Sequence, residues 1–182
     1  MGIICRLILI SSILFNASAF ADANDGEYLG LKLGDRYTAP RGAVPGDHIT
    51  GALVYNVDPH HRIEHLESIS IYVTPKSSII GSIFGEWYFP NRKAAESFAK
   101  RYMARLQERY GDWRRRRQSL TYGDYQLWVE VEEKPPIVDY WPSDKDVRVG
   151  IGLIYNPDSA GRSEWMALVN DELNDLQLSA KH

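Results

Sequence analysis

Three consecutive pieces of sequence decide the fold: LESISIYVTP (66–75), SSIIGSIFGEWYFP (77–90) and NRKAAESFAKRYMARLQERYGDW (91–113). The first alternates apolar and polar residues with a period of two, which is typical of a strand with one buried face. The second is apolar in both alternating sets, which favours a strand in the middle of a sheet. The third carries apolar residues at every fourth position and predicts a helix with one apolar stripe. We expect this helix to begin after Asn91 and to end near Gly111.

The segments on either side predict further strands of the same sheet. These strands are expected at 28–33, at 49–57, within 120–133 and at 147–155. In the first of them we expect Gly30 to allow another backbone to approach closely. In the last, Gly150 and Gly152 leave one face of the strand bare.

The C-terminal segment allows two interpretations. Residues 163–178 fit a helix capped by Ser163, and the alternation at 165–169 also fits a strand that pairs with the preceding one. The helix fits the longer stretch and is our prediction. The chain as a whole then predicts an α+β fold in two layers. It comprises a mainly antiparallel sheet of about six strands, with one long helix and a C-terminal helix packed on one face.

The N-terminal residues have the layout of a secretory signal peptide. Residues 1–21 contain a positive start with Arg6, a short apolar run and a small-residue site at Ala19-Phe20-Ala21. The apolar run is shorter than the about 20 residues that a membrane-spanning helix needs. Cys5 precedes this run, so it is not placed as the lipid-bearing cysteine of a lipoprotein. We therefore expect a cleaved signal peptide, one α+β domain over 22–182, and export as a soluble protein to a bacterial periplasm.

A cluster of histidines suggests one possible metal site. His61, Glu64 and His65 match the H-x-x-E-H pattern in which two imidazoles bind zinc and the carboxylate activates a metal-bound water. The segment is only about two helical turns long and lies between two predicted strands. No neighbouring residue is indicated as a third ligand. We interpret it as a polar turn, and we keep a small metal-dependent hydrolase as a third hypothesis for the function.

Positive charge is concentrated in the predicted helix and just after it. Residues 92–117 contain ten basic and three acidic side chains, whereas the whole chain has a net charge of −3. The candidate binding residues in this segment are Arg101, Arg105, Arg109, Arg114, Arg115, Arg116 and Arg117. The alternative is that the arginines are neutralised within the chain by Glu130, Glu132 and Glu133 of the next strand.

A second candidate surface is the loop that follows this strand. Tyr140 and Trp141 lie in a proline-stiffened segment, 135–142, in which aromatic side chains lose little entropy on binding. The alternative is that Trp141 packs back over the end of the sheet.

These features favour a binding protein over an enzyme. We expect an exported periplasmic module that binds another protein, acidic at the contact, as an inhibitor, an immunity protein against a toxin or an envelope accessory factor. The second hypothesis is a binder of anionic glycolipid or polymer of the cell envelope. We expect no cofactor, no nucleic-acid partner and no membrane-spanning segment.

Overall fold

The computed structural model of the chain describes residues 26–48, 50–57, 66–109, 114–116, 119–134 and 145–180. These residues form a large antiparallel sheet, a separate two-stranded hairpin and two helices. The strands are β1 (Glu27–Tyr28), β2 (Leu31–Lys32), β3 (Gly46–Asp47), β4 (Leu53–Val57), β5 (Leu66–Val73), β6 (Ile80–Phe89), β7 (Arg114–Arg116), β8 (Ser119–Tyr122), β9 (Tyr125–Glu133) and β10 (Val147–Tyr155). The helices are α1 (Arg92–Arg109) and α2 (Ala160–Ser179). The predicted α+β class with a mainly antiparallel sheet is confirmed.

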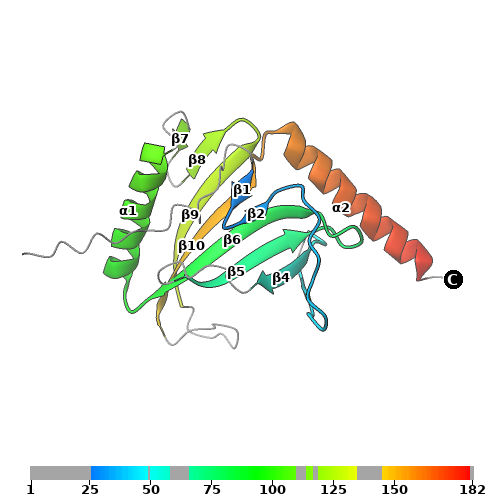
Figure 1. Cartoon of the computed structure of the whole chain (residues 1–182), viewed down its shortest axis with the longest axis horizontal. Helices are drawn as coiled ribbons and strands as arrows, with labels where there is room; N and C mark the ends of the chain where they lie inside the picture. The colour runs from blue at the N-terminus through cyan, green and yellow to red at the C-terminus, as the bar shows by residue number, and fades with distance from the viewer. Residues whose placement is uncertain are drawn as a thin grey trace, which may run out of the picture.

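The large sheet has the order β3-β4-β5-β6-β10-β9-β8-β7. The sheet thus has eight strands where about six were predicted, and its two edge strands β3 and β7 have only two and three residues. The segment expected to contain one strand within 120–133 forms two, β8 and β9. After β6 the chain crosses through α1 to the far edge and returns inward through β7, β8 and β9. The last strand, β10, then enters the gap between β6 and β9 (Figure 1). The predicted central position of β6 is therefore confirmed.

One face of the sheet carries the main core, and α1 lies on it. The helix begins as predicted, because the Asn91 side chain accepts a hydrogen bond of 3.0 Å from the backbone N–H of Ala94. Its apolar stripe buries Tyr102 and Leu106, and Phe98 packs against Trp87 with ring centroids 5.5 Å apart. The same face continues across the inward residues of β10, which are Val147, Val149, Ile151 and Leu153.

The β1–β2 hairpin covers the rest of this face and differs from the single strand predicted at 28–33. Leu29 and Gly30 both have positive φ, at 54° and 78°, which is the geometry of a two-residue type I′ turn. Gly30 therefore provides the turn, and a Cβ there would meet nothing within 4 Å, so the predicted close approach is wrong. The hairpin is joined to α1 by a hydrogen bond of 3.1 Å between the hydroxyls of Tyr28 and Tyr102.

The C-terminal segment is a helix, so the strand alternative is wrong. It begins earlier than predicted, since Ser159 is the N-cap and its hydroxyl accepts a hydrogen bond from the Arg162 N–H. Its buried residues Trp165 and Val169 pack with Ala52 and Tyr72. Tyr72 points away from the face that its neighbour Ile71 shares with α1. The two helices thus contact opposite faces of the sheet rather than one.

A β-bulge in β6 changes which of its side chains face the core. Simple alternation places Ile79 with Ile83 on one face and Ile80 on the other. The pairing of β5 with β6 shifts between Tyr72 and Val73, and this shift brings Ile80 into the main core and leaves Ile79 beside α2. The bulge also leaves a glycine under Trp165, where a Cβ would lie 1.9 Å from the indole ring.

None of the helices among the described residues is both long and apolar enough to cross a membrane.

Candidate functional site

The basic segment predicted to bind a partner is divided between α1 and the sheet edge. The exposed cations of α1 include Lys93, Lys100, Arg101 and Arg105, and we call these four residues the basic surface. Arg109 is the last residue of α1, and Arg114–Arg116 form the edge strand β7. Arg117, Tyr140 and Trp141 lie outside the described residues, as do His61, Glu64 and His65.

Of the three carboxylates in the alternative hypothesis, one is in contact with α1 among the described residues. Glu133 does contact α1, where its carboxylate accepts a hydrogen bond of 3.0 Å from Nη1 of Arg92. The Nε of the same arginine donates to Glu96 at 2.7 Å. Both pairs lie at the exposed start of the helix, one turn or more before Arg101.

Glu130 and Glu132, the other two carboxylates of that hypothesis, bind an arginine on the opposite face of the sheet. The Nη2 of Arg148 lies 3.0 Å from Oε1 of Glu130 and 2.5 Å from Oε2 of Glu132. Its Nη1 lies 2.8 Å from Oε1 of Glu86. We call these four residues the Arg148 network. The Arg148 side chain is 25% exposed and that of Glu86 is 16% exposed, so the network is half-buried.

The strand register builds this network. Arg148 of β10 pairs with Glu132 of β9, and Gly150 pairs with both Glu86 of β6 and Glu130 of β9. Glu132 therefore lies directly opposite Arg148, and Glu86 and Glu130 lie on either side of β10 two residues further along that strand. Gly150 leaves room for them, because a Cβ there would lie 2.8 Å from Oε1 of Glu130.

The network shifts the protonation equilibria of its members. Burial raises the pKa of Glu130, against the opposing effect of Arg148. Burial lowers the pKa of Arg148, but Glu86 and the other two carboxylates outweigh it and hold this pKa above its ordinary value. The Tyr88 pKa is raised by burial and by Glu86, to which its hydroxyl donates at 3.1 Å. Besides Arg148 and Tyr88, the hydroxyl of Ser68 also donates to Glu86, at 2.6 Å.

A row of aromatic rings crosses the same face beside the network. Ring centroids are 5.0 Å apart for His48 and Tyr72, 5.5 Å for Tyr72 and Phe84, and 6.3 Å for Phe84 and Trp128. All three contacts are edge-to-face, a favoured arrangement of aromatic pairs. Phe84 lies over Gly152 of β10, where a Cβ would be 2.3 Å from its ring. We call these four rings the aromatic row.

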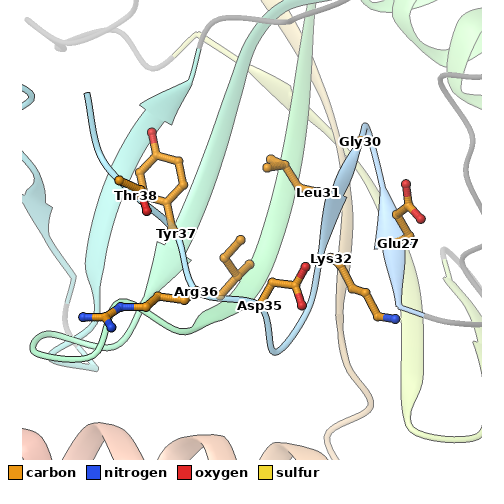
Figure 2. Close-up of a pocket in the computed structure, with 9 residues that line it drawn as sticks. Glu27, Gly30, Leu31, Lys32, Asp35, Arg36, Tyr37 and Thr38 are labelled. Carbon is orange, nitrogen blue, oxygen red and sulfur yellow. The ribbon is translucent and has the colours of Figure 1, made fainter. Parts of the chain in front are cut away.

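A separate cleft of about 320 Å³ opens beside the hairpin. Figure 2 shows Leu31 and Tyr37 on its two sides and Asp35 near its base, with Lys32 and Arg36 extending in opposite directions. Its lining contains two cations and two carboxylates, the remaining one being that of Glu27 on β1. It therefore has no net charge that would select a ligand.

Sequence reasoning missed the Arg148 network, although two signals pointed to it. A glutamate at 86 interrupts an otherwise apolar strand, and an arginine at 148 stands between two core valines. Charged side chains in such strands are seldom buried without a partner. The alternation of β9 also places Glu130 and Glu132 opposite to Val129 and Val131, which face the core.

No group of three or more histidine, cysteine, aspartate or glutamate residues suited to a metal ion occurs in the part of the chain that the structure describes. Comparisons with models of protein families, with curated proteins and with solved structures found no significant match.

Proposed function

We propose that this chain is an exported periplasmic module that binds another protein through the basic surface of α1. The partner is acidic at the contact, as expected for an inhibitor, an immunity protein or an envelope accessory factor. Basic or neutral partners would gain less, because complementary charge raises association rates and suppresses wrong partners.

The observation that carries the proposal is the pairing of Glu130 and Glu132 with Arg148. Because these carboxylates lie on the opposite face of the sheet, they do not compensate the cations of α1. Lys100 and Arg101 are exposed and form no ion pair with a described carboxylate. Arg101 and Arg105 are four residues apart on α1, and like charges at that spacing repel each other by a few tenths of a kcal/mol, which an attraction to an acidic partner would offset.

The edge strand adds to the proposal. β7 consists of three arginines at the end of the sheet order, and it follows α1 in the chain. Arginine suits bidentate contact with carboxylates and is less strongly hydrated than lysine, so it favours an interface. A charged edge strand also resists unspecific pairing with other strands.

The test is capture of partners from periplasmic extract with the wild-type chain and with the double variant Lys100→Gln/Arg101→Gln. The matched control is Lys32→Gln/Arg36→Gln, which removes two exposed cations from the hairpin region instead. We expect one protein to be captured by the wild type and the control and to be reduced by the first variant, with melting temperatures unchanged.

Two results would contradict the proposal. Equal capture by both variants would show that the partner does not bind through the basic surface. Capture of glycolipid or anionic polymer in place of a protein would favour the second hypothesis for the function.

A further inference from the structure

The Arg148 network and two rings of the aromatic row, Phe84 and Trp128, lie outside the cluster that packs on α2, whereas Tyr72 belongs to that cluster. The contact of α2 with β6 is at Gly81, under Trp165. Glu86 is five residues further along the same strand, which is roughly 17 Å at about 3.4 Å per residue. In the described residues, α1 and the hairpin lie on the other face (Figure 1). We call this region, which comprises the Arg148 network, Phe84 and Trp128, the open face.

The open face retains negative charge after its internal pairing. Three carboxylates surround one guanidinium, and two carboxylate oxygens lack a hydrogen-bond donor among the described residues. These are Oε2 of Glu130 and Oε1 of Glu132. The Glu132 side chain is 44% exposed, so an incoming cation can reach it.

Aromatic side chains lie next to these free oxygens. Trp128, Glu130 and Glu132 occupy alternate positions of β9 and point to the same face, each about 6.8 Å from the next. An ammonium or guanidinium group is stabilised by a carboxylate and, within about 6 Å, by the face of an aromatic ring. A row of this spacing matches an extended segment with a basic residue at every second position.

We propose that the open face binds an extended basic segment of a partner protein, whose lysine or arginine side chains contact Glu130, Glu132 and Trp128. The net charge of −3 disfavours association of two copies of the chain, so a basic segment of another protein is the occupant that charge favours. The open face and the basic surface lie on opposite faces of the sheet. Two partners of opposite charge can therefore bind at the same time, and this inference does not depend on the function proposed for α1.

The test uses two synthetic peptides and the full domain. The probe is the acetylated, amidated peptide SKSKSKSK, and SESESESE is its acidic counterpart; binding is measured by calorimetry at low salt. The variant is Glu132→Gln, and the matched control is Glu133→Gln. The control removes the same charge from the next residue of β9, which contacts α1 instead.

We expect the lysine peptide to bind the wild type and Glu133→Gln with the same affinity within twofold. Its affinity for Glu132→Gln should be at least fivefold lower, with the melting temperature within a few degrees of wild type. The glutamate peptide should not bind. Equal losses in both variants, or no binding of the lysine peptide at millimolar concentration, would overturn the inference. Self-association that Glu132→Gln abolishes would overturn it in favour of a second copy.

Discussion

Replacing Arg148 with methionine should destabilise the protein in a way that depends on pH. The variant keeps most of the apolar stem but leaves Glu86, Glu130 and Glu132 without their cation. Removing one partner of a fully buried ion pair costs about 3–5 kcal/mol, and the 25% exposure of Arg148 reduces this to about 2–3 kcal/mol near pH 7.

The direction of the pH effect follows from the raised pKa of Glu130. A carboxyl whose pKa is higher in the folded state stabilises the fold below its unfolded pKa of about 4.3. That stability is lost as the pH rises through the folded value. Without Arg148 the folded pKa rises further. The difference between variant and wild type should therefore be largest near pH 7 and become smaller towards pH 4.

Urea denaturation at pH 7 and pH 4.5 measures both quantities. The control is Arg92→Met, which also removes an arginine that binds two carboxylates, but at an exposed site. Exposed pairs contribute little to stability, so the control should have a denaturation midpoint close to wild type. Equal midpoints for the two variants, or an Arg148 effect that is the same at both pH values, would refute the reasoning.

Three further substitutions test other parts of the structure. Glu172→Gln should cost about 1–2 kcal/mol, because the Glu172 carboxylate accepts two backbone N–H groups and a hydroxyl of the β5–β6 turn, whereas Asp171→Asn should leave the urea midpoint unchanged. Burial raises the pKa of Glu172, but these hydrogen bonds outweigh it and lower the pKa. The stability that Glu172 adds is therefore present at neutral pH, and thermal melts should show its loss as the pH falls below about 4. Gly152→Ala should cost about 1–3 kcal/mol in the same assay because its Cβ would overlap a phenylalanine ring, whereas Gly46→Ala has open space and should not. Phe98→Ala should cost about 3 kcal/mol in urea denaturation, since this ring packs on three others. A midpoint equal to that of the wild type would show that Phe98 does not lie on the buried face of the helix.

The fold could be predicted where the apolar residues of a segment recur with the period of a strand or a helix. The alternation of β5 and β10 and the four-residue repeat of α1 each identify the buried face directly. The prediction of a single strand at 28–33 was wrong because the turn has a positive φ at Leu29. Glycine usually marks such a position in a sequence, and here it is a leucine. The prediction of which faces Ile79 and Ile80 occupy was wrong because a bulge shifts the strand register without any change in composition.

The candidate site was less predictable because it depends on which strands become neighbours. Arg148 contacts Glu86 and Glu130 only because β10 enters between two strands that are distant in sequence. From sequence alone, pairing of the β9 carboxylates with the arginines that precede them is one of two alternatives. The alternation that places Val129 in the core already excludes this for Glu130 and Glu132, and that inference was available without the structure.

The salt dependence of association is the most direct test of the claim that the basic surface binds an acidic partner. It requires the association rate constant of the captured partner with wild type and with Lys100→Gln/Arg101→Gln, measured from about 20 to 300 mM salt, where the screening length falls below about 10 Å. The account predicts that the wild-type rate constant decreases steeply with salt. The variant should associate several-fold more slowly at low salt, should depend less on salt, and should keep the wild-type melting temperature. Identical salt dependence in the two proteins, or a variant that is destabilised but associates at the wild-type rate, would contradict it.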